Sequence, residues 1–252
     1  TMEIMKREAG KVDIFIQARE NSTRFPNKIL KKISNKSILE IILERISMIK
    51  NIKNVVLVTG PEQSNSILAK EAKRLEIDVF FGEEENILDR FWNAAKLYKS
   101  DHIIRITGDC PLLDFDLINR GIGIFHSDKK IDLLTNTRKR TYPHGFDFEI
   151  FTRDSLRKSW ETRVQDSDDS KERFINPVEF ILNSGEFEIF SMEGDIDQSN
   201  IRLTIDYPED LEMISMIYEK LNLEKQFFTS VDIIEFLEKN PDSMRINEKY
   251  EN

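Results

Sequence analysis

Residues 11–28 read KVDIFIQARENSTRFPNK, and this stretch decides how the rest of the chain is interpreted. Residues 11–17 carry the β-branched and aromatic side chains that are typical of a strand. The loop after them contains three cations, Arg19, Arg24 and Lys28, together with Ser22, Thr23 and Pro26. Arginine can bind a polyphosphate bidentately, and hydroxyl and backbone N–H groups add neutral donors. A basic loop at a strand end therefore predicts a site for an anion.

The composition makes this loop more informative, because the chain as a whole is acidic. It has 252 residues, a formal net charge of −9, 39% hydrophobic and 33% charged residues, which is typical of a globular protein. A net acidic surface argues against nucleic acid as a partner. No apolar run reaches the roughly 18 residues that a membrane span needs. Cys110 is the single cysteine, so no internal disulfide can form, and we expect a cytoplasmic protein.

The first 135 residues alternate between strand-like and helical patterns. β-rich runs occur at residues 11–17, 54–59, 77–81, 102–106 and 131–134, and helical patterns at 37–49, 65–76, 86–98 and 114–125. This alternation predicts an α/β fold with a mixed, mainly parallel sheet sandwiched by helices. Ligands of such sheets bind beyond the carboxyl ends of the strands.

The pattern changes after residue 140. Strand-like runs occur at residues 146–151, 187–193 and 200–206, and helical patterns at 154–160, 170–183, 208–222 and 229–241. We interpret residues 11–222 as a single domain with an inserted α+β lobe at about 140–200. Residues 223–252 would then form a C-terminal helical extension.

Residues 17–30, QARENSTRFPNKIL, resemble the signature QAR-x-x-S-T-R-x-P-x-K-x-L of a cytidylyltransferase family. That family contains CMP-Kdo synthetases, acylneuraminate cytidylyltransferases and the spore-coat polysaccharide (SpsF-type) proteins, and the SpsF-type branch is most similar. The resemblance continues through VFFGEEENILDRFWNAA, IIRITGDCPLLD, TYPHGFDFEIF and IRLTIDYPEDLEMI, so it covers most of residues 11–220.

The resemblance implies a Rossmann-like fold of the nucleotide-diphospho-sugar transferase type and transfer of CMP from CTP to a sugar or sugar acid, with Mg²⁺. It also implies a homodimer that pairs through the inserted lobe. Nucleotide-binding positions carry over to Gln17, Ala18, Arg19, Ser22, Thr23, Arg24, Lys28, Arg90 and Thr107. Asn21 and Asn27 stand where the family usually has glycine. Asparagine tolerates a positive φ better than other non-glycine residues, so we expect the loop to keep its shape.

Two aspartates follow strand-like runs. Asp109 lies just past residues 102–106, and Asp206 ends residues 200–206. Taken alone, each could equally be a turn or helix-start residue. The resemblance matches both to the family's metal-binding aspartates, so with Arg19 and Lys28 they are the expected catalytic residues. Mg²⁺ typically takes one or two carboxylates plus phosphates and water.

The resemblance places residues 141–151 over the acceptor. It implies acceptor contacts from Tyr142, His144, Asp147 and Glu149. Arg202 precedes the second aspartate and could contact phosphate or an acceptor carboxylate, or could equally be a surface strand residue. A solvated polar strand face is the competing interpretation for the two carboxylates. His144 and Phe174 differ from the residues that SpsF-type proteins often have, which makes acceptor identity the open question.

Two other motifs suggest different chemistry. Cys110 could be a nucleophile, but no Cys/His pairing is recognisable, and a small buried residue is the favoured interpretation. Residues 114–116, DFD, resemble the metal motif of glycosyltransferases, although acids in a first helical turn favour capping. A metal-dependent glycosyltransferase, a nucleotidyltransferase that uses GTP or UTP, and a non-catalytic sugar-nucleotide sensor remain the alternatives to a cytidylyltransferase.

Overall fold

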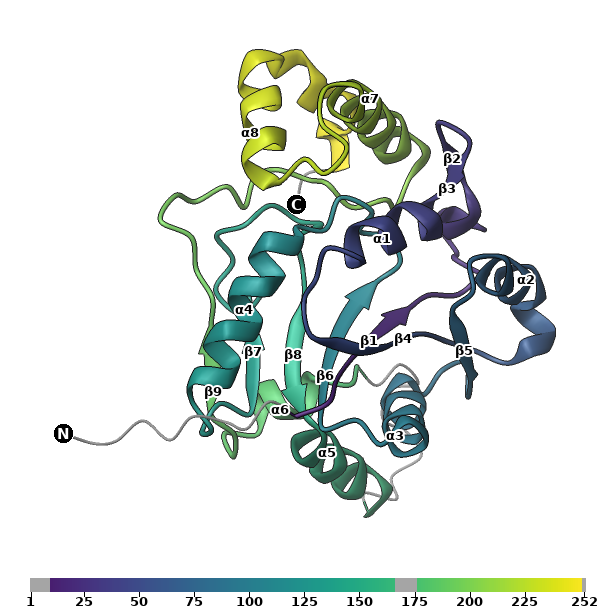
Figure 1. The fold of residues 1–252 in the computed structure, drawn as a ribbon, viewed down its shortest axis with the longest axis vertical. Helices are drawn as coiled ribbons and strands as arrows, with labels where there is room; N and C mark the ends of the chain where they lie inside the picture. Colours follow the sequence, from purple (N-terminus) through teal and green to yellow (C-terminus); the bar gives the residue numbers. More distant parts are fainter. Residues whose placement is uncertain (1–9, 166–175, 251–252) are drawn as a thin grey trace.

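The computed structural model describes residues 10–165 and 176–250, and a single large sheet runs through it (Figure 1). The strands of this sheet are β1 (Val12–Gln17), β4 (Ile52–Thr59), β5 (Asp78–Phe81), β6 (His102–Thr107), β7 (Leu133–Thr135), β8 (Glu149–Thr152) and β9 (Ile189–Ser191). Their spatial order is β5-β4-β1-β6-β8-β7-β9. β8 alone runs antiparallel to its neighbours in this sheet. The predicted mixed, mainly parallel sheet is confirmed.

Helices cover both faces of the sheet. They are α1 (Ile38–Ile46), α2 (Ser66–Arg74), α3 (Ile87–Tyr98), α4 (Phe115–Ser127), α5 (Arg153–Gln165), α6 (Glu179–Asn183), α7 (Pro208–Glu224) and α8 (Ser230–Lys239). Alternation along β1 separates the two cores, because neighbouring strand residues point to opposite faces. Ile14 and Ile16 pack with α1, α4 and α7, whereas Phe15 packs with α3, α5 and α6.

Short elements complete the chain. They are the hairpin β2 (Lys32–Ile33) and β3 (Lys36–Ser37), and the 3₁₀ turns η1 (Lys28–Leu30), η2 (Glu62–Ser64), η3 (Pro241–Ile246) and η4 (Glu248–Tyr250). The helical pattern at 170–183 extends beyond the described residues, and within them only α6 is helical there. Phe174 also lies outside the described residues. No helix among the residues with assigned structure is both long and apolar enough to cross a bilayer.

The prediction of a strand at residues 200–206 is wrong. This segment is extended but forms only an isolated bridge between Arg202 and His144. Its backbone groups bond to loops instead: Leu203 N donates to His144 O at 2.6 Å, and Ile205 N donates to Asp109 O at 2.8 Å. The segment therefore joins the loop after β6 to the loop before β8, outside the sheet ladder.

The C-terminal helices pack onto the main core. Phe228, Ile233 and Leu237 are buried in the same cluster as α1 and α4. Arg45 of α1 ties the two parts together, since its guanidinium donates to the carbonyls of Leu113 (2.7 Å) and Phe228 (2.9 Å). Burial lowers the pKa of Arg45 to about 10. The predicted boundaries at residues 140, 200 and 223 stay predictions, although β8 and β9 of the predicted lobe belong to the central sheet.

Candidate active site

The basic loop begins where two parallel strands end together. Gln17 at the end of β1 is in register with Thr107 at the end of β6, so the loop faces the turn that carries Asp109. Glu20 fixes the loop's shape. Its carboxylate accepts a hydrogen bond from Leu68 N at the start of α2 (2.7 Å), and its own carbonyl accepts from Ser22 N and Asn27 N. Sequence reasoning missed Glu20, whose buried position in a basic loop has no local signal.

The two asparagines of the loop differ in conformation. Asn27 has φ 57°, in the left-handed region, as predicted for a residue that replaces glycine. Asn21 is not among the described residues with positive φ, so of the two asparagines only Asn27 uses the tolerance for that conformation. The left-handed turn at Asn27 leads directly into η1, which carries Lys28.

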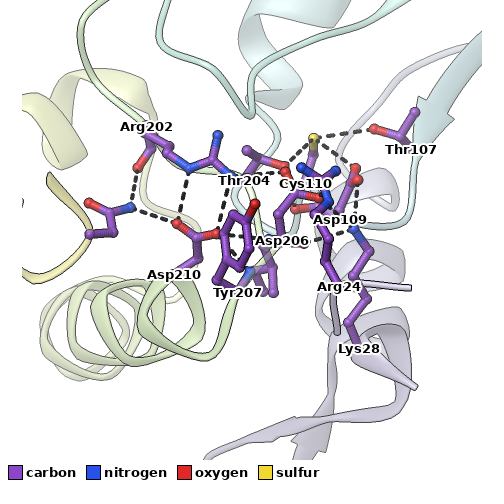
Figure 2. A network of polar contacts seen from close by, with 12 residues as sticks. Arg24, Lys28, Thr107, Asp109, Cys110, Arg202, Thr204, Asp206, Tyr207 and Asp210 are labelled. Carbon is purple, nitrogen blue, oxygen red and sulfur yellow. Dashed lines mark hydrogen bonds and ion pairs between the residues drawn. The ribbon is translucent and has the colours of Figure 1, made fainter. Parts of the chain in front are cut away.

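Lys28 lies between the two predicted aspartates (Figure 2). Its ammonium donates to Asp109 Oδ2 at 2.9 Å, to Asp206 Oδ1 at 3.1 Å and to the carbonyl of Ile205 at 2.8 Å. Arg24 adds a second cation, with Nη2 at 2.9 Å from Asp206 Oδ1. Two carboxylates from distant parts of the chain thus meet the cations of the first loop at one point.

The charges in this cluster stabilise one another. Burial lowers the pKa of Lys28, but attraction to Asp109 and Asp206 outweighs it and holds that pKa above its ordinary value. For the carboxyl group of Asp109, burial acts in the opposite direction and raises the pKa. The nearby charge of Lys28 outweighs burial, so the pKa of Asp109 is lower than its ordinary value. Both groups are therefore charged at neutral pH.

A second ion pair holds the other side of Asp206. Arg202 Nη2 donates to Asp206 Oδ2 at 2.9 Å, and Arg202 Nε donates to Asp210 Oδ1 at 3.1 Å. Asp210, in the first turn of α7, is fully buried and also accepts from the backbone N–H groups of Asp206 and Tyr207. Arg202 was predicted to touch phosphate or an acceptor, and the structure commits its guanidinium to these two carboxylates.

Arg90 is a buried cation at the wall of the cavity. It is 3% exposed, and its Nε and Nη1 have no hydrogen-bond partner among the described residues. Burial lowers its pKa, nearby Glu84 opposes that change, and Arg19 adds to it. A buried guanidinium with two unsatisfied nitrogens is costly, so the site favours an anion or acceptor group that would satisfy them.

One cavity collects most of the predicted nucleotide-binding residues. It is lined by Gln17, Ala18, Arg19, Ser22, Arg24, Lys28, Ile29, Glu84, Ile87, Arg90, Thr107, Gly108, Asp109 and Asp206. Thr23 is exposed and does not line it. The five residues predicted to contact the acceptor do not line it either.

The acceptor candidates lie beside the cavity and carry ion pairs of their own. Asp147 accepts two hydrogen bonds from Arg140, at 2.6 and 2.8 Å. Glu149, which is buried, accepts two from Arg105, at 3.1 and 3.0 Å. The two carboxylates are therefore not a solvated strand face, because each is paired with an arginine. Arg105 and Arg140 were missed because ion pairing across a fold leaves no mark on local sequence.

His144 and Tyr142 sit between this group and the Asp206 segment. Burial lowers the pKa of His144, the charge of Arg140 lowers it further, Asp147 opposes the change, and Arg202 contributes least. The imidazole is therefore neutral at pH 7. Tyr142 packs against the core beside Gly194, where an added Cβ would lie 3.3 Å from its ring.

The two competing motifs are explained structurally. Cys110 is buried, and burial together with the charge of Asp109 raises its pKa well above the ordinary value, so it is no thiolate nucleophile. Asp114 caps α4, where Oδ1 accepts from Asp116 N and Leu117 N and Oδ2 from Ser230 N. A carboxylate saturated by three backbone donors is a poor metal ligand, which weighs against the glycosyltransferase alternative.

The donor set fits a hard divalent cation. The carboxylates of Asp109 and Asp206 approach one cationic group, Lys28 Nζ, within 3.1 Å, so a single ion can reach both. Among the described residues, no cluster of three or more His, Cys, Asp or Glu is arranged to hold a metal ion. Two carboxylates, with phosphate oxygens and water completing the shell, match the way Mg²⁺ is held.

Comparisons with known proteins identify the family of this chain. Residues 14–235 match the family described as Cytidylyltransferase. An uncharacterized protein of Methanocaldococcus jannaschii is 34% identical over 92% of both chains. The spore coat polysaccharide biosynthesis protein SpsF of Bacillus subtilis is 30% identical over 90% of this chain and 94% of its own. A solved cytidylyltransferase from Leptospira borgpetersenii is 34% identical, with a TM-score of 0.82 over 93% of this chain and 97% of that one.

Proposed function

This chain belongs to the cytidylyltransferase family, and from that premise we propose that it transfers CMP from CTP to a sugar, sugar acid or related small alcohol and releases pyrophosphate. The observation that carries the proposal is the contact of Lys28 with Asp109 and Asp206 in a cavity that three arginines also line. The name of the Bacillus subtilis relative favours an acceptor used in polysaccharide synthesis.

Arg19, Arg24 and Lys28 would bind the triphosphate. They lie along the loop after β1, and Arg24 is more than half exposed, so it is free to turn toward a ligand. Cations placed on the β- and γ-phosphates stabilise the negative charge that develops on the departing pyrophosphate. Gln17, Ala18, Ser22, Arg90 and Thr107 would complete the nucleotide site, with Thr23 as the weakest candidate because it is exposed.

Asp109 and Asp206 would hold Mg²⁺, which neutralises phosphate charge when it is bound. In the structure Lys28 occupies the space between these carboxylates. We infer that Lys28 turns toward the phosphates when nucleotide and cation bind, because an ammonium and a divalent cation cannot share one position. Arg202 contacts the other oxygen of Asp206, Oδ2, at 2.9 Å, so it would not compete with Lys28 for Oδ1.

The acceptor would lie beside the segment of residues 142–149. This segment is hydrogen-bonded to residues 201–203, next to Asp206, and it carries Tyr142, His144, Asp147 and Glu149. The acceptor oxygen would bond to the α-phosphorus and give up its proton to solvent. The bond from the α-phosphorus to the bridging oxygen would break, and pyrophosphate would leave with that oxygen. Catalysis is then mainly positioning and charge neutralisation. A homodimer and a cytoplasmic location are part of the same proposal.

Phosphorus NMR of the reaction tests the bond that is made. With CTP, Mg²⁺ and a suitable acceptor we expect a new phosphodiester signal together with pyrophosphate. Formation of free CMP without a phosphodiester would contradict transfer to an acceptor. Formation of a nucleoside diphosphate from a nucleotide sugar would instead support the glycosyltransferase alternative.

A further inference from the structure

The last turn of the chain reaches the proposed metal site through a short series of buried hydrogen bonds. We propose that Asn247 is a positioning residue: it fixes the carboxylate of Asp210, which in turn sets Arg202 and the backbone at Asp206. The inference rests on the proposed role of Asp206 as a metal ligand. It adds a residue outside residues 14–235, the part of the chain that matches the family.

Asp210 is the centre of this arrangement. Its side chain is completely buried, and its two oxygens accept hydrogen bonds from Arg202, Asn247 and the backbone N–H groups of Asp206 and Tyr207. The orientation of this carboxylate therefore decides where the Asp206 backbone and the Arg202 guanidinium lie. Arg202 then holds Asp206 Oδ2 at 2.9 Å.

Asn247 fixes that orientation from the opposite side. Its Nδ2 donates to Asp210 Oδ1 at 2.9 Å and lies 3.3 Å from the carbonyl of Arg202, and the residue is 3% exposed. Without this amide, Asp210 Oδ1 keeps only its bond from Arg202 Nε. A carboxylate that loses a donor in a buried site shifts toward its remaining partners, so Arg202 and Asp206 would move with it.

The segment that carries Asn247 is itself fixed to the start of α7. The ring of Tyr250 stacks on that of Tyr207, with centroids 3.8 Å apart and an interplanar angle of 6°. Lys249 Nζ and Tyr250 Oη both donate to the Glu209 carboxylate, at 2.7 and 3.1 Å. The Arg24 guanidinium in turn lies over the Tyr207 ring, 5.5 Å from its centroid. Residues 247–250 are thus held against the same helix turn that presents Asp206.

The test compares Asn247→Ala with Asn247→Asp, which keeps the shape of the side chain but replaces its donor with an acceptor. Asn240→Ala is the matched control, because its amide makes a comparable bond to the Phe236 carbonyl at 2.8 Å at the exposed C-terminal end of α8, away from Asp210. Calorimetry gives the dissociation constant of CTP with Mg²⁺ and again in EDTA. Turnover and melting curves are recorded for each variant, with Asn247→Ser as a milder third substitution.

We expect Asn247→Ala and Asn247→Asp each to reduce the magnesium-dependent gain in CTP affinity, and turnover, by about tenfold, and Asn247→Ser to have a smaller effect in the same direction. CTP affinity in EDTA should stay near the wild-type value in all three. Asn240→Ala should match the wild type. A purely structural role for Asn247 would lower the melting temperature and leave the magnesium-dependent gain intact. Folded Asn247 variants with wild-type magnesium dependence and turnover would overturn the inference. A wild-type protein without magnesium-dependent CTP binding would overturn the proposed function instead.

Discussion

Lys28 Nζ lies 2.9 Å from Asp109 Oδ2, although 81 residues separate them in the chain. The parallel pairing of β1 with β6 brings about this meeting, because the basic loop and the Asp109 turn both begin where these two strands end, at one edge of the sheet. The same ammonium reaches Asp206 at 3.1 Å. A basic loop and two carboxylates at one point are what a metal-assisted reaction on a polyphosphate requires.

The first prediction concerns the two carboxylates. Asp109→Asn and Asp206→Asn should each reduce turnover by about a hundredfold or more, because an amide is a neutral and weaker ligand for Mg²⁺. Both variants should remain folded, since asparagine keeps the size of the side chain. EDTA should abolish wild-type activity. Full turnover in EDTA would contradict the metal assignment.

The second prediction concerns Arg24. Arg24→Ala should weaken CTP binding by about tenfold and CMP binding much less, because the guanidinium would bind the β- and γ-phosphates, which CMP does not have. Arg74→Ala is the matched control, since Arg74 is similarly exposed but pairs with Glu40 and Glu71 away from the cavity. Calorimetry measures both nucleotides. An equal weakening of CTP and CMP binding would contradict the assignment of Arg24 to the β- and γ-phosphates.

The site also shows what the sequence could and could not reveal. The main strands, the loop cations and the left-handed Asn27 were predictable because each leaves a local pattern. Asp109 and Asp206 were singled out only by the family resemblance, since each could equally have been a turn or helix-start residue. Residues 200–206 alternate like a strand, yet their backbone bonds to the loops at His144 and Asp109. Alternation of polar and apolar residues indicates an extended backbone, but it does not indicate which segment that backbone forms hydrogen bonds with.

Ion pairs between distant residues were not predictable in the same way. Glu149 was predicted as an acceptor ligand, and it pairs with Arg105, 44 residues away. Arg105 also donates to Gln17 at 2.8 Å, so one arginine links a predicted nucleotide-binding residue to a predicted acceptor-binding residue. Partners across strands depend on sheet order, which the sequence pattern alone does not give.

The third prediction concerns pH. The pKa of His144 in the folded protein is lower than its unfolded value of 6.5. Below pH 6.5 the unfolded chain is therefore protonated at His144 while the folded protein is still largely neutral there, which favours unfolding. The corresponding stability is present above pH 6.5 and is lost as the pH falls through the native pKa. Urea unfolding between about pH 7.5 and 5 should show a smaller loss of stability in His144→Gln than in wild type. Parallel curves for the two proteins would contradict the lowered pKa.

The fourth prediction concerns Gly145. Its φ is +108°, and an added Cβ would lie 2.3 Å from the carbonyl oxygen of Leu203, so Gly145→Ala should destabilise the protein by about 2 kcal/mol or more. Gly185→Ala is the control for backbone strain alone, because Gly185 has φ +75° and open space around it. Turnover should also fall in Gly145→Ala, since residues 201–206 would be displaced. Equal destabilisation in both variants would contradict the claim that a clash with the Leu203 carbonyl adds to the cost of backbone strain at Gly145.

Pyrophosphate release from each of the four NTPs, against a panel of sugars and sugar acids with Mg²⁺, tests the central claim most directly. We predict release from CTP with at least one acceptor, little release from ATP, GTP or UTP, and none in Asp206→Asn. Release that requires GTP or UTP would correct the donor and leave the reaction type intact. No acceptor-dependent pyrophosphate from any nucleotide would contradict the claim that this chain is a nucleotidyltransferase.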